Sequence, residues 1–117
     1  MRDILDVHTH TVASGHAYNS MLEMIHEAQE KGLEVYGITE HAPKMPGTCG
    51  EFYFHNLKVV PRKHGDLELL LGVELNIWTK REQWIWKSPI WEEWMWQSRA
   101  FIHPASNRAA GSGIRNV

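Results

Sequence analysis

The sequence contains a single cysteine, Cys49, among its 117 residues. A disulfide within the chain is therefore excluded, which fits a reducing compartment. The sequence also lacks any apolar run close to the roughly 20 residues that a membrane-spanning helix needs. Residues 1–4 run into a charged, strand-like segment without the apolar stretch of a secretory signal. From these absences we expect a cytoplasmic protein that has no membrane partner.

An excess of positive charge is also missing. Lysine and arginine total 12 residues and aspartate and glutamate total 14, so the formal net charge is -2. No polybasic segment is present, and we therefore expect no nucleic-acid partner. A chain of this length is one domain at most. The composition says nothing about the oligomeric state.

Three short apolar or β-branched runs predict strands, at residues 4–7, 35–39 and 67–71. The segment between the first two predicts a helix. Its start has the S-x-x-E form of a capping box, from Ser20 to Glu23, and Gly32 lies where a glycine typically ends a helix. The order strand, helix, strand favours a right-handed parallel crossover, so we predict an α/β fold. Prolines and glycines after residue 42 predict a long loop before the third strand.

Each predicted strand ends at a side chain that can bind a metal ion: His8, His41 and Glu74. The carboxyl ends of parallel strands form the edge where catalytic groups gather. His10 lies two residues after His8, so on a strand both imidazoles would face the same side. His16, on the following loop, can reach the same place. A lone histidine at a strand end usually only meets a carbonyl group, but the combination favours a metal site.

Three segments resemble the motifs of PHP (polymerase and histidinol phosphatase) phosphatases. Residues 6–18, DVHTHTVASGHAY, resemble the opening motif D-x-H-x-H-T-x-x-S-x-H-A. Residues 37–43, GITEHAP, resemble the second motif, I-T-D-H-G/A-P, and residues 72–76, GVELN, resemble the third, G-x-E-x-N. Order and spacing agree over residues 1–77. The sequence is most similar to stand-alone bacterial PHP phosphatases that hold three zinc ions.

The resemblance implies the amino-terminal part of a distorted seven-stranded (β/α) barrel with a metal cluster at its carboxyl edge. The residues that match the family's metal ligands are His8, His10, His16, His41 and Glu74, and Glu74 is expected to bridge two ions. Two or three zinc ions are expected in the complete domain, with manganese or iron as alternatives. No catalytic residue beyond these ligands is implied.

The implied activity is hydrolysis of a small phosphorylated metabolite by a metal-activated water. A histidinol-phosphatase-like enzyme shares these motifs and is one alternative. A metal-binding fragment without catalysis is another. A nucleic-acid role like that of polymerase-attached PHP domains is disfavoured, because no polymerase sequence follows.

Other polar residues are weaker candidates. Arg62 is a candidate contact for a phosphate group, and His55 for the substrate. We assign no role to His26 and His64, and Cys49 is interpreted as an incidental loop thiol.

The composition changes sharply at Trp78. All six tryptophans lie between residues 78 and 96, and none lies before. A shift of reading frame explains this tail better than a divergent sequence does. Tryptophan has only the codon TGG, and reading the codons of residues 94–97 two bases later gives Asp-Val-Ala, which resembles a segment that follows the third motif in the family. On this interpretation His103 and Pro104 resemble a later family motif only by coincidence.

We therefore predict two regions: residues 1–77, the amino-terminal part of a PHP domain, and residues 78–117, an out-of-frame or divergent tail without a fold of its own. The chain would then be an incomplete and inactive fragment. Such a fragment would expose sheet edges and a partial core, which favours aggregation.

Overall fold

The computed structural model describes residues 3–75, residue 93 and residues 100–104. The tryptophans of the predicted tail lie outside these residues. The elements, in chain order, are β1 (Leu5–Thr9), the 3₁₀ turn η1 (Val12–Ser14), α1 (Met21–Glu30), β2 (Val35–His41), α2 (Glu51–Asn56), the 3₁₀ turn η2 (Leu57–Val59), β3 (Lys63–His64), β4 (Leu67–Leu75) and β5 (Ala100–Pro104).

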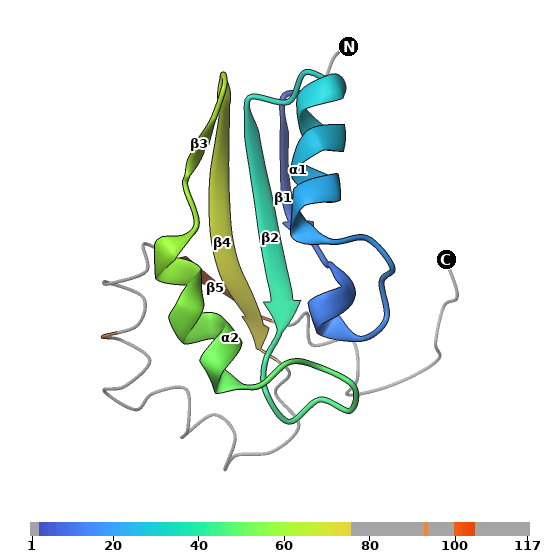
Figure 1. The fold of residues 1–117 in the computed structure, drawn as a ribbon, viewed down its shortest axis with the longest axis vertical. Coiled ribbons are helices and arrows are strands. Elements are labelled where there is room, and N and C mark those ends of the chain that lie inside the picture. Colours follow the sequence, from blue (N-terminus) through green and yellow to red (C-terminus); the bar gives the residue numbers. More distant parts are fainter. Residues whose placement is uncertain (1–2, 76–92, 94–99, 105–117) are drawn as a thin grey trace.

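The described strands form one sheet in the order β1-β2-β4, with β3 and β5 both paired to β4 (Figure 1). The pairs β1–β2, β2–β4 and β4–β5 are parallel, and only the two-residue β3 runs antiparallel. The predicted α/β class is therefore confirmed. Within the described residues the sheet is open, so the seven-stranded barrel stays a prediction. β5 adds to this sheet and places His103 opposite Glu74.

Helix α1 connects β1 to β2, as the capping box predicted. The Ser20 hydroxyl accepts a hydrogen bond from the Glu23 amide, and the Glu23 carboxylate accepts one from the Ser20 amide. This reciprocal pair satisfies two amides that the first turn leaves without helical partners. The helix gives way at Gly32, whose φ of +72° is a left-handed conformation that glycine adopts without strain.

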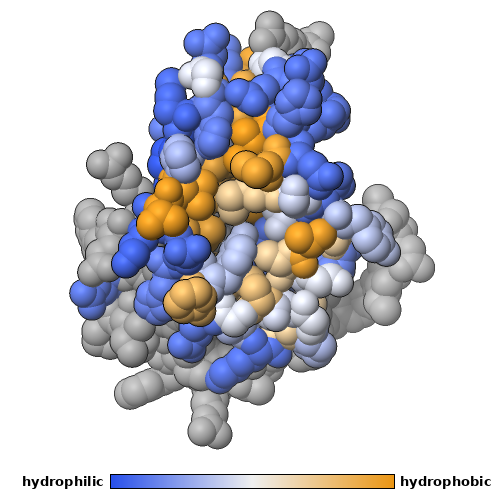
Figure 2. Space-filling model, viewed as in Figure 1, coloured by the Kyte–Doolittle hydropathy of each residue, from blue (hydrophilic) through white to orange (hydrophobic). Residues whose placement is uncertain are grey.

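The core lies between the sheet and the two helices. Side chains alternate along β4, so Leu67, Leu69, Leu71 and Val73 all face this side and are almost fully buried. They pack with residues of α1 and α2, including Ile25 and Phe54. Both helices lie on the viewer's side of the sheet in Figure 1. On that face apolar side chains reach the surface between more polar ones (Figure 2).

Helix α2 occupies part of the region where the sequence predicted only a loop. It has six residues, and Gly50 at its N-cap offers no side-chain hydrogen bond, so the usual start signal is missing. Burial of Phe54 and, just beyond the helix, of Leu57 holds it against the sheet. None of the described helices is both long and apolar enough to cross a membrane.

A bulge in β1 adjusts the strand at Val7 and His8. Asp6 pairs with Tyr36 and Thr9 with Ile38, so two residues of β1 lie opposite Gly37 alone. A Cβ atom on Gly37 would lie only 2.7 Å from the Val7 Cα. The close approach of β1 to β2 at this point therefore requires glycine.

We expect Gly37→Ala to destabilise the folded chain by about 1–3 kcal/mol, because the added methyl group forces β1 away from β2. Urea unfolding followed by circular dichroism measures the loss. Gly50→Ala is the matched control, since a Cβ atom there meets no other atom within 4 Å. Equal losses in the two variants would contradict the close-approach argument.

Candidate metal centre

The register of the two central strands places the first two candidate ligands side by side. His41 pairs directly with Glu74, the last-but-one residue of β4. The Ala42 amide donates a hydrogen bond to the Glu74 carbonyl oxygen at 3.0 Å, which extends the pairing beyond the end of β2. The candidate centre therefore lies at the carboxyl edge of the parallel sheet, where strand ends of this kind form binding sites.

One carboxylate oxygen of Glu74 is the meeting point of three imidazoles. Its Oε2 atom lies 3.0 Å from Nε2 of His10, 3.3 Å from Nδ1 of His41 and 3.6 Å from Nε2 of His8. The side chains of His10, His41 and Glu74 are 10–15% exposed, whereas that of His8 is 40% exposed. His8 therefore lies at the solvent side of the cluster, and the other three form its interior.

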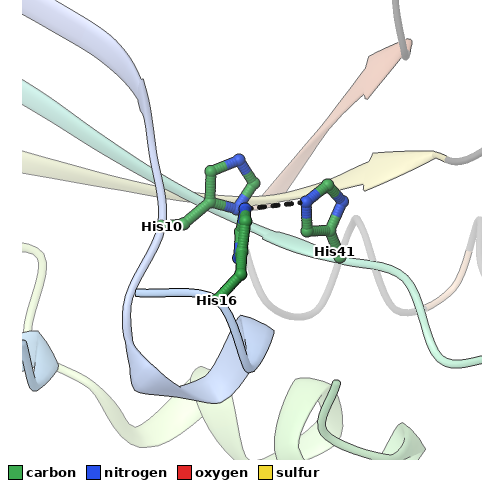
Figure 3. A group of neighbouring side chains, drawn as sticks. All are labelled: His10, His16 and His41. Atoms are coloured by element: carbon green, nitrogen blue, oxygen red, sulfur yellow. Dashed lines mark hydrogen bonds between the residues drawn. The ribbon is translucent and has the colours of Figure 1, made fainter. Parts of the chain in front are cut away.

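His16 completes the group from the loop after η1. Its Nε2 atom lies 3.2 Å from Nε2 of His41 (Figure 3). The rings of His10 and His41 stack with centroids 4.4 Å apart, and the His16 ring lies within 5 Å of both. All five predicted ligands are thus brought together, from three strand ends and one loop.

The donor atoms form two overlapping groups of three. His10, His16 and His41 make one group, and His8, His10 and Glu74 make the other; within each, one donor atom per residue lies within 4.8 Å of the others. Two donors on one tetrahedral zinc ion, each about 2.0–2.2 Å from it, are about 3.3–3.6 Å apart. The separations of 3.3 and 3.6 Å from Glu74 to His41 and His8 lie in this range, and those of 3.0 Å (His10 to Glu74) and 3.2 Å (His16 to His41) lie within about 0.3 Å of it. Imidazole and carboxylate together suit zinc, and also manganese or iron.

A buried carboxylate that the sequence analysis did not single out anchors the loop carrying His10 and His16. Glu40 is 1% exposed and accepts hydrogen bonds from the Thr11 amide at 3.0 Å and from the hydroxyls of Thr11 and Ser14. Ser14 in turn accepts a bond from the His41 amide at 2.9 Å. The sequence did offer a signal for this anchor. Glu40 directly precedes His41 at the end of a strand, and adjacent side chains of a strand point to opposite faces, so Glu40 had to point away from the cluster.

A second loop, residues 42–49, supports the same region from outside. The Cys49 amide donates to the Ala13 carbonyl oxygen at 2.8 Å, and the Thr48 hydroxyl donates to the His41 carbonyl oxygen at 2.9 Å. Gly15, with φ of +77°, packs so closely that a Cβ atom would lie 2.2 Å from the Gly47 carbonyl oxygen. The backbone just before His16 is therefore tightly fixed.

The two candidate substrate contacts, Arg62 and His55, are not members of the five-residue cluster and stay predictions. The Arg62 carbonyl oxygen accepts a hydrogen bond from the Leu69 amide, five residues before Glu74 on β4. At about 3.3 Å per residue this is about 16 Å from the cluster, farther than an arginine side chain reaches. His55 lies exposed on α2 and belongs to neither donor group. The structure thus brings neither residue to the five ligands.

The cysteine near the site has the properties of an inert thiol. Burial raises the pKa of Cys49, and the Glu40 carboxylate raises it further. Burial likewise raises the pKa of Tyr53 well above its usual range. A thiol with a raised pKa stays protonated near neutral pH and is a poor nucleophile and metal ligand. This agrees with the interpretation of Cys49 as an incidental thiol.

Because His10 belongs to both donor groups, His10→Ala should impair both. We expect the zinc affinity of this variant to fall more than about 100-fold, because loss of a residue that only hydrogen-bonds a metal ligand typically lowers the affinity about 10–100-fold. His16→Ala should impair only one group. Competition with a chromophoric zinc chelator measures affinity and stoichiometry.

His26→Ala is the control, because His26 is exposed on α1 and outside both groups. Circular dichroism verifies that each variant keeps its fold. Wild-type zinc affinity in a folded His10→Ala variant would show that the cluster is not the zinc site.

The amino-acid sequence is similar to those of several bacterial proteins that are named probable phosphatases. A 77-residue stretch is 52% identical to a protein named probable phosphatase from Thermoanaerobacter sp. (strain X514), covering 66% of this chain and 31% of that relative. Identity is 53% over 73 residues with a probable phosphatase of Caldicellulosiruptor bescii, covering 62% and 30%. It is 53% over 77 residues with one of Clostridium botulinum (strain Hall), covering 66% and 32%. The chain thus spans about a third of the length of these curated relatives.

The PHP domain itself matches residues 6–108. This match includes β1 from its second residue, β2, β4 and every residue of the cluster, and it continues through β5. The expected resemblance is therefore confirmed, and the chain belongs to the PHP domain family.

Proposed function

We propose that this chain carries the amino-terminal part of the metal centre of a phosphoesterase that hydrolyses a small phosphorylated metabolite. The convergence of four imidazoles and the Glu74 carboxylate at one sheet edge carries the proposal. Membership of the PHP domain family and relatives named probable phosphatases support it.

Divalent ions held there would activate a water molecule and neutralise charge on a phosphate group. The chain's own part is to hold the ligands in place. His10, His41 and Glu74 form the interior of the centre, and the exposed side of His8 and His16 leaves room for a substrate. Phosphate is an anion, so a cluster of cations bound in this position would attract it.

The hydroxyl groups around the cluster favour water over a covalent nucleophile. Thr11 and Ser14 donate to Glu40, Thr9 donates to the Gly37 carbonyl oxygen and Thr48 to the His41 carbonyl oxygen. A hydroxyl nucleophile needs an adjacent base to take its proton. In the described part of the chain, the protons of Thr9 and Thr48 go to backbone carbonyl oxygens, and Thr11 and Ser14 are themselves buried at 1% and 2% exposure, away from a substrate.

We further propose that the chain by itself is an incomplete and inactive fragment. Its coverage of about 31% of a relative's length supports this, because a (β/α) barrel needs strands from a longer sequence. The same coverage favours a second candidate function, metal binding without catalysis.

We expect a full-length, in-frame version to hydrolyse p-nitrophenyl phosphate with zinc or manganese, and the 117-residue chain to bind metal without turnover. Absorbance of released nitrophenolate measures the rate, and L-histidinol phosphate tests the histidinol-phosphatase alternative. Glu74→Gln in the long version should lower the rate at least 100-fold, because it removes the shared carboxylate. A long version without metal-dependent turnover would overturn the phosphatase proposal.

For residues 78–117 we propose a shift of reading frame just after Ile77. The clustering of all six tryptophans supports it. A genuine tail would instead account for β5 and for the family match through residue 108. The nucleotide sequence decides: restoring one base should open a frame encoding S-F/I-H-P-P and later a D-x-H motif. A stop codon within a few codons of the restored base would reject the frameshift.

A further inference from the structure

The Ser14 hydroxyl contacts three groups at the candidate metal centre. It donates to Oε2 of Glu40, accepts from the His41 amide at 2.9 Å, and lies 3.1 Å from Nδ1 of His10. Ser14 is 2% exposed and Glu40 is 1% exposed, so water does not compete for these contacts. The three contacts fill the capacity of one hydroxyl group, which is one donor and two acceptors.

The direction of each bond follows from the partners. A carboxylate only accepts and a backbone amide only donates, so the Ser14 proton goes to Glu40 and one Ser14 lone pair goes to the His41 amide. The contact that is left, to His10, can only be filled by a proton on Nδ1. The other bonds of Glu40 agree, because they come from the amide and the hydroxyl of Thr11.

We propose that Glu40, acting through Ser14, is a positioning residue that makes His10 carry a proton on Nδ1 and present Nε2 to the metal ion. Nε2 is the atom that lies 3.0 Å from Glu74. The inference rests on the proposed metal centre for its use, since the outer partner of a ligating imidazole sets its tautomer and ring orientation. It also explains why a charged side chain is buried directly beside the ligand strand end.

The consecutive residues Glu40 and His41 point to opposite faces of β2 and have different roles at the centre. His41 faces the cluster as a ligand, and Glu40 faces the η1 loop as its anchor. The same strand end thus supplies one ligand and fixes the orientation of another. Ser14 joins the two through its bonds to the His41 amide and to His10.

Long-range ¹H–¹⁵N correlation of the full, metal-free chain with labelled histidine reads the His10 tautomer directly, and His10→Gln assigns the signal. We expect a protonated Nδ1 in the wild type. Ser14→Ala removes the hydroxyl oxygen that accepts the Nδ1 proton of His10. In Glu40→Gln the new amide group can donate to Ser14, so the Ser14 hydroxyl can instead donate its proton to Nδ1 of His10. Both variants should move the proton toward Nε2, where Glu74 accepts it, and should lower zinc affinity about 10–100-fold.

Two controls separate this role from general stability. Glu34→Gln removes an exposed carboxylate at the opposite end of the β2 region and should leave both readouts unchanged. Glu40→Asp keeps a carboxylate and should retain the Nδ1 proton in any folded sample.

A His10 protonated only on Nε2 in the wild type would overturn the inference even if no variant folds. The inference would also be overturned if the Ser14→Ala variant and the Glu40→Gln variant were both folded and both kept the His10 tautomer of the wild type. Because the tautomer is read without metal, the expected proton positions support the inference even if zinc titration rejects the metal centre. Zinc binding with an unchanged tautomer in both variants rejects the inference and leaves the metal centre standing.

Discussion

The parallel register between β2 and β4 is the constraint on which the rest of the structure depends. Seven consecutive pairs join these strands, from Val35 with Glu68 to His41 with Glu74. Because side chains alternate, this register sends Leu69, Leu71 and Val73 into the core and brings His41 and Glu74 together on the other face. A slip of one residue would put Glu74 into the core and uncover apolar side chains. Folding stability and site geometry therefore select the same register.

The apolar core stabilises the packing of the helices on the sheet, and polar contacts stabilise the carboxyl edge. Each fully buried leucine or isoleucine contributes about 1.5–3 kcal/mol, and such residues hold α1, α2 and the sheet together. The carboxyl edge holds five ionisable ligand side chains and cannot be stabilised in that way. There the buried Glu40, saturated with hydrogen bonds, fixes the loop that carries His10 and His16. A buried carboxylate is tolerated only when its hydrogen bonds are made, so this anchor forms as a unit.

The sequence predicted the features that depend on local pattern or on strand order. The three long strands, the capped helix from Ser20 and the parallel crossover follow from periodicity and caps, and the structure confirms them. The convergence of the five ligands followed from strand ends and from the family motifs. Other features depend on contacts between distant segments. The short α2 forms because Phe54 is buried, and the bulge opposite Gly37 forms because Val7 comes close. The Glu40–Ser14–His10 connection spans 30 residues and was likewise not visible in either segment alone.

Zinc K-edge X-ray absorption of the zinc-loaded 117-residue chain tests the central claim, that strand-end imidazoles and Glu74 hold a metal ion. The structure predicts a shell of nitrogen and oxygen atoms at about 2.0–2.2 Å, with the outer-shell scattering of several imidazole rings. That imidazole scattering should weaken in His10→Ala. A sulfur atom at about 2.3 Å, which would indicate Cys49 as a ligand, or an oxygen shell without imidazole scattering would contradict the account.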